Sequence, residues 1–375
     1  MKPQIIEVQT GRMRPRHGRF HRAFADLCRD LGVDSSFEPV TKLKRIKMNI
    51  ATRRSGVRAI NLNESNQCAI IHQALNAGTT LYISEFDMPL AVHGYNVQRH
   101  YKSALTAREL MERDHLRSIM VFSHWSKQSF DLHFGEKVSA KCRVVYPLAY
   151  EEAVCGNLAR RKYDFTFIST NFRIKCGPEL VRAFSAVKSA DHADIRLCVV
   201  TNLERARELL GDLASYKGVD WLEANQTEKQ VAALLAETNC LVHPSLSDSF
   251  GVVVLEALAA GCALLTTDIA SFPEMVMNGE NGFYFSPPTS SVVGGTFITE
   301  YGTVAYHEAY LNTLSLHTVE AMLKEKMSFM INNPSRVESM MKKSSSLYSE
   351  RFSLAAWRQS VQGTLYFAFP ELFRR

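Results

Sequence analysis

The segment 240–266 alternates between apolar runs and a helix, and this alternation limits the fold more than any other feature of the sequence. A short apolar run comes first, then a polar turn, then a helix that we expect from Phe250 to Ala260, and then a second apolar run. Gly261 is a typical helix stop. Short apolar strands that alternate with helices are typical of parallel sheets in α/β proteins.

The expected helix carries a single acid, and a second acid precedes it. Its residues are apolar nearly all round, which predicts a buried helix. A lone carboxylate at Glu256 is costly there unless a partner donates hydrogen bonds to it, and a pair of ligand hydroxyls is a natural donor. The alternative is an acid that complements the helix N-terminus, but that effect belongs to the first turn. Asp248 lies before the helix, and the backbone N–H groups beside Phe250 and Gly251 suit a phosphate.

With these residues, the segment resembles the nucleotide-sugar signature of the retaining glycosyltransferases of family 4, also called group 1. That signature is a Glu, seven residues and a second Glu, with Phe-Gly just after the first acid. Asp248 and Glu256 take the two acidic places here. The resemblance continues through residues 274–283, which are similar to the family's Glu-x-Val-x-x-Gly-x-x-Gly loop, and it covers about residues 240–286.

The resemblance implies an α/β chain with the GT-B fold, in which two Rossmann-like domains with parallel sheets face across an interdomain cleft. We expect an N-terminal acceptor-side domain at 1–150 and a C-terminal nucleotide-sugar-binding domain at 160–350. The alternation of strands and helices on both sides of 148–161 supports this division. A last helix, at about 355–375, is expected to return to the first domain.

The sequence predicts individual elements in both halves. In the first half we expect a basic, turn-rich loop at 11–19 and a helix N-cap at Ser123. The expected strands are 5–8, 80–83, 118–122 and 142–147, and the expected helices are 20–31, 69–77 and 104–117. In the second half the expected strands are 165–168, 196–200 and 219–222, and the expected helices are 179–187, 203–214 and 227–237, the last with an N-cap at Thr227. A loop is expected at 290–303, and helices resume at about residue 318.

The donor site follows from the resemblance. Lys175 matches the family's lysine, and Arg173 is a candidate for the family's arginine, whose own position is not matched. A surface lysine is the alternative interpretation. The implied catalytic residues are Lys175, Asp248 and Glu256: the lysine stabilises charge on the leaving diphosphate, Asp248 holds hydroxyls of the transferred sugar and Glu256 holds the ribose hydroxyls. The donor-binding set is Arg173, Lys175, Asp248, Ser249, Phe250, Gly251 and Glu256.

The implied reaction is the transfer of a sugar, of hexosyltransferase type, from a nucleotide-sugar donor to a glycan or lipid-linked acceptor with retention of configuration. The processes that such enzymes serve include cell-surface polysaccharide, lipopolysaccharide and glycolipid assembly. No Asp-x-Asp motif of metal-dependent transferases is present in the sequence, so we expect no metal and no cofactor. Asp248 is one methylene shorter than the usual Glu, which leaves the position and identity of the sugar open.

Two acids and a proline follow an expected strand in the first half, where ligands bind in open α/β sheets. Relatives commonly place a histidine after an N-terminal strand. Here Glu85 and Asp87 stand near that place and His93 is the nearest histidine, so these three are acceptor-side candidates. Arg12 and Arg14 complete this set.

Positive charge is concentrated at the N-terminal end. Residues 1–60 carry 14 Lys and Arg against 5 Asp and Glu, a balance of +9 within a total of +6. We expect an anionic membrane surface as the partner, with Phe20 and Phe24 as apolar anchors beside a basic cluster. A merely solvated loop is the alternative, and nothing resembling a nucleic-acid-binding motif accompanies the charge. The cluster consists of Arg12, Arg14, Arg16, Arg19 and Arg22.

Composition places the chain among globular proteins of the cytoplasm. No apolar run is long enough for a membrane span, we expect no signal peptide, and the eight cysteines form no Cys-x-x-Cys pair. Scattered thiols indicate a reducing compartment, the cytoplasm. The basic N-terminal charge adds the expectation of peripheral attachment to the inner face of a membrane. Two other functions remain open: a GT-B sugar-nucleotide epimerase or phosphorylase, and a non-catalytic sugar-nucleotide-binding protein. A nucleic-acid binder would need salt-dependent affinity for DNA or RNA.

Overall fold

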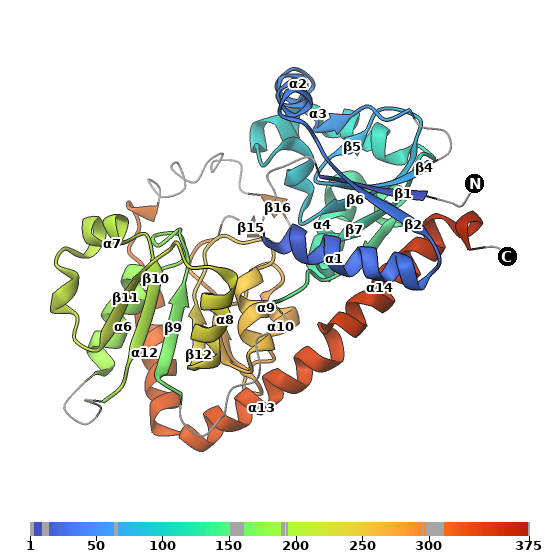
Figure 1. Cartoon of the computed structure of the whole chain (residues 1–375). Coiled ribbons are helices and arrows are strands. Elements are labelled where there is room, and N and C mark those ends of the chain that lie inside the picture. The colour runs from blue at the N-terminus through green and yellow to red at the C-terminus, as the bar shows by residue number, and fades with distance from the viewer. Residues whose placement is uncertain are drawn as a thin grey trace. The chain divides into compact units, whose positions relative to one another are not determined.

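The computed structural model divides into two compact α/β units, each with a parallel sheet (Figure 1). Unit 1 comprises residues 1–148, 294–303 and 353–375, and unit 2 comprises residues 149–293 and 304–352. The expected fold class, two Rossmann-like halves with parallel sheets, is confirmed. The structure describes residues 4–9, 15–63, 67–150, 161–188, 192, 194–290, 292–293, 296–297 and 311–373.

Unit 1 is built on a six-stranded sheet in the order β2-β1-β4-β6-β7-β8, with every neighbouring pair parallel. The strands are β1 (Gln4–Gln9), β2 (Asp34–Pro39), β4 (Gln67–His72), β6 (Leu81–Phe86), β7 (Leu116–Val121) and β8 (Cys142–Val144). The strand order changes direction between β1 and β4. At such a point the connections leave on opposite sides, and a crevice forms at the carboxyl ends of the strands.

Helices cover both faces of this sheet. On one face α1 and α14 pack together, and Phe24, Ile70 and Trp357 belong to their shared core (Figure 1). The other face buries Ile71, Phe86 and their neighbours. The helices of unit 1 are α1 (Pro15–Asp30), α2 (Lys42–Ser55), η1 (Pro89–His93), α3 (Val97–Glu112), α4 (His124–Phe134), α5 (Glu136–Ser139), α14 (Leu354–Ala368) and η4 (Pro370–Leu372). The short strands β3 (Ala59–Ile60) and β5 (Leu75–Asn76) pair with each other.

Two predictions for unit 1 are wrong, and two elements were not predicted. The segment 69–77 forms β4 and β5 and not a helix, because a short apolar run that is buried on both faces cannot be assigned by periodicity. Residues 15–19 belong to α1, whose first residue, Pro15, suits a helix start. Elements β2 and α2 were not anticipated, since neither shows a clear apolar period. The N-cap at Ser123 is confirmed: its side chain accepts a hydrogen bond from the N–H of Ser126 at 2.9 Å.

Unit 2 repeats the pattern with the order β11-β10-β9-β12-β13-β14, again parallel throughout. Its direction changes between β9 and β12. The strands are β9 (Tyr163–Ile168), β10 (Leu197–Thr201), β11 (Val219–Glu223), β12 (Thr238–His243), β13 (Ala263–Thr267) and β14 (Gly282–Phe285). The expected loop at 290–303 contains two short strands, β15 (Val292–Val293) and β16 (Thr296–Phe297).

The helices of unit 2 complete the second core. One face of the sheet packs on α6 and α12, with Phe165, Phe184 and Leu323 fully or almost fully buried. Thr227 caps α8 through a capping box with Gln230, as its sequence position predicts. The helices are α6 (Gly177–Val187), α7 (Leu203–Leu210), η3 (Leu213–Ser215), α8 (Glu228–Ala236), α9 (Val252–Ala259), α10 (Phe272–Met275), α12 (His317–Asn332) and α13 (Pro334–Arg351).

Candidate functional site

The loops that follow β9 and β12 meet at the point where the strand order of unit 2 reverses. The first loop runs from 169 to 176 and the second from 244 to 251. Open α/β sheets bind ligands at the carboxyl ends of the strands that flank such a point. The first loop supplies Lys175 and the second supplies Asp248, so two of the predicted site residues come together here.

Lys175 is buried, and its ammonium is fully engaged within the unit. The Nζ atom donates to Asp248 Oδ2 at 2.6 Å, to Ser245 Oγ at 2.9 Å and to the carbonyl oxygen of Ser247 at 2.5 Å. An ammonium has three N–H donors, so all of them are used. The next residue, Cys176, has a left-handed backbone with φ 51° at the start of α6. A non-glycine residue in that region stores strain, and such strain concentrates at functional sites.

Asp248 is held on both oxygens. Besides the contact with Lys175, Oδ1 accepts the N–H groups of Ser249 at 2.9 Å and Gly251 at 3.0 Å. Burial alone opposes ionisation, but the Lys175 ammonium and the ring of His243 hold the pKa of Asp248 well below its ordinary value. The carboxylate is therefore charged at neutral pH. The Gly251 N–H, which we expected to face a phosphate, points instead at this carboxylate.

His243 is a site residue that the sequence analysis missed. It ends β12, is buried, and places Nε2 3.3 Å from Asp248 Oδ2. Burial lowers the pKa of His243 against the opposing effect of Asp248, so the ring is neutral and Nε2 carries the proton toward the carboxylate. Its Nδ1 is buried with no hydrogen-bond partner among the described residues. The signal was a histidine at the last position of a buried strand, five residues before the first signature acid.

Buried hydroxyl groups fix the second loop. Thr267 Oγ1 donates to the carbonyl of Ser245 at 2.6 Å, and Ser271 Oγ donates to that of Phe250 at 2.9 Å. Gly251 has φ 74°, and a Cβ built there would lie 2.4 Å from the Phe272 ring. Both the left-handed backbone and the lack of space require glycine at this position. The loop is thus rigid before any ligand binds.

Glu256 lies on a partly exposed stripe of α9. Val254, Leu255, Ala257 and Leu258 are buried, while Val252, Val253, Glu256 and Ala259 are partly exposed. The expectation that the whole helix is buried is wrong, because the packing of unit 2 leaves positions 252, 256 and 259 on one accessible face. The Glu256 carboxylate is therefore accessible to a ligand without first breaking the core. The helix begins at Val252, later than expected, because Gly251 has a non-helical backbone.

Arg173 is not joined to this network in the part of the chain that the structure describes. Its guanidinium donates to Glu179 Oε1 at 3.0 Å, to Asn312 Oδ1 at 3.0 Å and to the carbonyl of Leu311 at 2.7 Å. These contacts tie the start of α6 to the segment before α12. The geometry gives Arg173 a structural role in the ligand-free structure, and its donor contact stays a prediction.

The acceptor-side candidates separate into two groups. Glu85 and Asp87 lie at the carboxyl end of β6, as expected, where the Tyr95 hydroxyl donates to Asp87 Oδ1 at 2.7 Å. His93 has no exposed surface, and its Nδ1 lies 2.9 Å from the carbonyl oxygen of Gly56. It is a core residue at the end of η1, so its acceptor-side assignment is wrong for this conformation.

The basic cluster is only partly described. Arg12 and Arg14 lie outside the described residues, as does the side chain of Arg16. Arg19 is buried and donates to the carbonyl of Leu148 at 2.8 Å, whereas Arg22 is exposed. Phe20 and Phe24 are buried in the core of unit 1. The predicted role of both rings as membrane anchors is therefore wrong, because the apolar face of α1 packs on the sheet.

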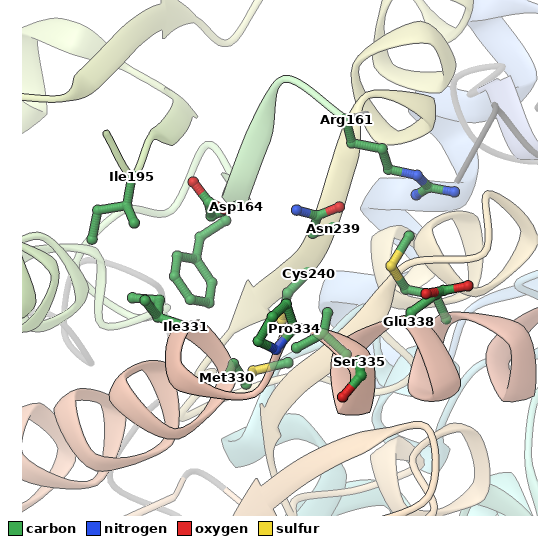
Figure 2. Close-up of a pocket in the computed structure, with 13 residues that line it drawn as sticks. Arg161, Asp164, Ile195, Asn239, Cys240, Met330, Ile331, Pro334, Ser335 and Glu338 are labelled. Atoms are coloured by element: carbon green, nitrogen blue, oxygen red, sulfur yellow. The ribbon is translucent and has the colours of Figure 1, made fainter. Parts of the chain in front are cut away.

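A cavity of about 810 Å³ opens at the other edge of the unit 2 sheet, by the amino ends of β9 and β12 (Figure 2). Asp164 and Asn239 project from the strands, and Pro334 and Ser335 face them from α13. Arg161 at its rim donates to the carbonyls of Thr238 and Ala260 at 2.5 and 3.0 Å. These bonds place a cation at the end of α9, where carbonyl groups lack helical partners. This cavity is separate from the Lys175–Asp248 loops.

Neither a cluster of metal-ligating side chains nor a membrane-spanning helix is found in the described part of the chain. No group of three or more His, Cys, Asp and Glu side chains there has the arrangement of a metal site. Among the described helices, none has the length and apolar character needed to cross a bilayer.

Comparison with known proteins shows what the segment that holds these loops is similar to. Residues 157–298 match the family model of the glycosyl transferases group 1. Alpha-maltose-1-phosphate synthase of Mycobacterium tuberculosis is 28% identical over 127 residues, 34% of this chain and 30% of that protein. N-acetyl-alpha-D-glucosaminyl L-malate synthase of Bacillus anthracis is 29% identical over 115 residues, 30% of each chain. The match thus spans about a third of the length of these curated relatives.

Solved structures show the same fold over the whole chain. HepE of Anabaena, in complex with UDP and glucose, aligns with a TM-score of 0.62 and 12% identity over 97% of this chain and 99% of its own. WaaG, a glycosyltransferase involved in lipopolysaccharide biosynthesis, aligns with a TM-score of 0.63 and 12% identity over 97% and 99%. At this identity the likeness shows the fold alone. Residues 157–298, which hold the Lys175–Asp248 loops and Glu256, thus match the group 1 glycosyl transferases, and the chain has the GT-B fold of the glycosyltransferase structures that it resembles.

Proposed function

We propose that the protein transfers a sugar from a nucleotide-sugar donor to an acceptor hydroxyl, with retention of anomeric configuration. The observation that carries this proposal is the Lys175–Asp248 contact of 2.6 Å at the strand-order reversal of unit 2, inside the segment that matches the family. A fixed cation and a fixed carboxylate at one point suit a substrate that carries both phosphate and hydroxyl groups. The solved HepE structure holds UDP and glucose, which makes a nucleoside-diphosphate hexose the first donor to test.

Each residue has a distinct part in this reaction. Glu256, partly exposed on α9, accepts the two ribose hydroxyls of the donor. On donor binding the Lys175–Asp248 contact opens, so that the carboxylate takes hydroxyls of the sugar and the ammonium faces the β-phosphate. The acceptor oxygen then bonds to the anomeric carbon, the bond from that carbon to the diphosphate breaks, and the acceptor proton leaves with the diphosphate. Positive charge beside the departing oxygen lowers the barrier.

We infer that this reaction needs no metal. The charge of Lys175 and the positive end of the α9 dipole supply at the diphosphate what a divalent cation supplies in other transferases. Activity is therefore expected to persist in EDTA. Loss of activity in EDTA that returns with Mg²⁺ or Mn²⁺ would contradict this part of the proposal without affecting the donor assignment.

A donor screen tests the function directly. Thermal unfolding is measured with UDP, GDP, ADP and CMP sugars, because a ligand that binds only the folded state raises its stability. The sugar nucleotide that stabilises the protein is then incubated with candidate glycan and lipid acceptors, and NMR gives the anomeric configuration of the product. Stabilisation with a matched transfer product supports the proposal. Donor that returns as a different sugar nucleotide identifies an epimerase, sugar 1-phosphate formed only with added phosphate identifies a phosphorylase, and binding without turnover identifies a carrier.

We also propose that unit 1 attaches to an anionic membrane surface, through α2 and not through Phe20 and Phe24. All charged residues of α2 are basic, and Ile46 and Ile50 are exposed by 46% and 47%. Ile46, Ile50 and Arg53 repeat at helical spacing, so apolar and basic side chains share one exposed face. Such a helix binds an anionic bilayer in the plane of the interface. This surface would bring the protein to a lipid-linked acceptor at the cytoplasmic side.

A further inference from the structure

A buried histidine joins two carboxylates in unit 1. His72 ends β4, and its Nδ1 lies 2.6 Å from Glu85 Oε2 on β6 while its Nε2 lies 3.0 Å from Glu7 Oε1 on β1. All three side chains are buried. The three strands are neighbours in the centre of the sheet. The network therefore crosses the sheet at the carboxyl end, and it includes the β1–β4 pair where the strand order reverses.

The hydrogen bonds determine the charge of the ring. An ionised carboxylate only accepts hydrogen bonds, so two carboxylates on both ring nitrogens require both nitrogens to donate. His72 is then an imidazolium. Burial alone lowers the pKa of His72, but the charges and hydrogen bonds of Glu85 and Glu7 raise it to about 9. The contacts and this raised pKa together indicate an imidazolium between Glu7 and Glu85 at neutral pH.

Groups from every neighbouring element keep the network in place. From α1, His21 Nδ1 lies 3.0 Å from Glu7 Oε2, and the Phe20 ring packs edge-on against the His72 ring at 4.9 Å between centroids. Phe20 in turn packs on Trp357 of α14. Aromatic walls exclude water, and a low local dielectric strengthens the ion pairs.

Glu85 borders a cavity of about 10 Å³ whose other walls include Phe20, Tyr146 and Trp357. This volume is close to the minimum for a single water molecule, so it also suits one hydroxyl group. The backbone beside it is strained: Gln73 has φ 56°, and its N–H donates to the carbonyl of Glu85 at 2.9 Å. Strain of this kind is retained where surrounding structure fixes a functional geometry.

We propose that His72 is a positioning residue that keeps Glu85 ionised and directed at one hydroxyl group of the acceptor. Glu85 is the residue that touches the hydroxyl, and His72 acts through it, with Glu7 keeping the proton on His72. The inference rests on the proposed transfer of a sugar to an acceptor. It extends that function, because the acceptor-side acid is then a member of a charged network that spans three strands.

The charge of His72 can be tested without any activity. Nitrogen-15 NMR of the imidazole follows the ring from pH 5 to 10 in wild type and in Glu85→Gln. We expect both ring nitrogens to be protonated at pH 7 in wild type, and the pKa of His72 to fall by at least one unit in the variant. A neutral tautomer at pH 7 in the folded wild-type protein overturns the proposal, whether or not the protein proves to be a transferase.

A double-mutant cycle tests the positioning role. His72→Gln is expected to lower kcat/KM at least tenfold at pH 7 and to move the acid limb of the pH profile upward by about one unit, since a nearby cation lowers a carboxyl pKa. In the Glu85→Gln background the same change is expected to have little further effect. His317→Gln, on an exposed site of α12, is the control.

The outcomes separate the two proposals. An equal loss from His72→Gln in both backgrounds shows that His72 does not act through Glu85, and overturns the positioning role. If His72→Gln does not fold, Glu7→Gln replaces it: loss of this anion is expected to lower the pKa of His72, and an unchanged NMR titration would overturn the role of Glu7. If wild type turns over no donor, the proposed function fails while the charge of His72 is still decided by NMR. In that case an unchanged NMR titration in Glu85→Gln also overturns the coupling.

Discussion

Lys175 and Asp248 are 73 residues apart in the sequence, yet Nζ and Oδ2 lie 2.6 Å apart. They meet because β9 and β12 are adjacent in a sheet whose order reverses between them. Each residue stands in the loop that follows its strand. The parallel arrangement puts both loops on the same edge, and two buried hydroxyl contacts fix the second loop there. The sheet thus brings the two predicted site residues together without any ligand.

Replacement of Lys175 by alanine is expected to reduce turnover more than donor affinity. Its charge acts mainly as negative charge develops on the leaving diphosphate, so its loss raises the barrier to the chemical step. Loss of an interaction of this kind lowers kcat by about 10²–10³-fold in comparable sites. Single-turnover rates and donor affinity by calorimetry separate the two effects. Lys217→Ala, at an exposed position of the same unit, is the control.

Equal losses of rate and affinity in Lys175→Ala would show that the lysine binds ground state and transition state alike. No loss of either would assign it a structural role, that of fixing Ser245, Ser247 and Asp248. Circular dichroism of the variant is needed for that decision, because a collapsed loop would lower both quantities.

Glu256→Gln is expected to weaken donor binding at least tenfold. The change replaces a carboxylate that accepts two ribose hydroxyls by a neutral amide, and a hydrogen bond to a charged group contributes about 1.5–3 kcal/mol. Glu237→Gln, at the exposed C-cap of α8, removes a charge from the same unit without touching the site. Calorimetric titration with the donor measures both. Unchanged affinity in a folded Glu256→Gln protein would remove the residue from the donor site.

The sequence predicted the second unit better than the first. In unit 2 the strands alternate with helices that have capping residues such as Thr227, so pattern and structure agree. In unit 1 the prediction of a helix at 69–77 was wrong, because a strand that is buried on both faces shows no alternation of apolar and polar residues. The site shows the same limit. The position of Glu256 in its helix was readable from the spacing. The partners of Asp248 and Arg173 were not, because Lys175, Leu311 and Asn312 come from distant parts of the sequence.

Two buried histidines of unit 1, His93 and His100, are expected to make its stability fall in acid. His100 Nε2 lies 2.9 Å from His133 Nδ1, and the His93 ring packs on His100 at 4.8 Å between centroids. Burial lowers the pKa of both His93 and His100, the latter to about 3 from its usual 6.5. Between these two pKa values the unfolded chain therefore binds more protons than the folded chain does. The stability contribution is complete above pH 6.5 and is lost as the pH falls toward 3.

Urea unfolding at several pH values measures this effect. The slope is at most about 1.4 kcal/mol per pH unit for each histidine. Trp221→Phe leaves tryptophan only at 125 and 357, both in unit 1, so fluorescence then reports that unit alone. His100→Phe is expected to flatten the dependence. A slope that is unchanged in this variant would place the acid sensitivity elsewhere.

Gly251→Ala is expected to destabilise unit 2 and to impair donor binding. The residue has φ 74°, and an added Cβ would lie 2.4 Å from the Phe272 ring. The left-handed backbone alone costs about 1–3 kcal/mol for a residue with a side chain. Gly279→Ala, at another glycine of unit 2 with positive φ (81°) but no atom within 4 Å of the added Cβ, is the control without a clash. Thermal unfolding of both variants compares them, and equal losses would show that Phe272 simply moves aside.

Attachment of α2 to an anionic bilayer is the last prediction. Wild type is expected to co-sediment with vesicles that contain phosphatidylserine or phosphatidylglycerol, and not with neutral phosphatidylcholine vesicles. Each basic residue near an anionic surface contributes about 1 kcal/mol, and salt screens that attraction. The pair Ile46→Ser and Ile50→Ser removes the apolar part, whereas Leu132→Ser, exposed by 59% on α4, is the matched control. Binding that survives the isoleucine changes but is lost with Arg53→Gln and Arg54→Gln would show that α2 binds the bilayer through charge alone, without insertion of apolar side chains. Binding to neither vesicle type would exclude the membrane as the partner of this helix.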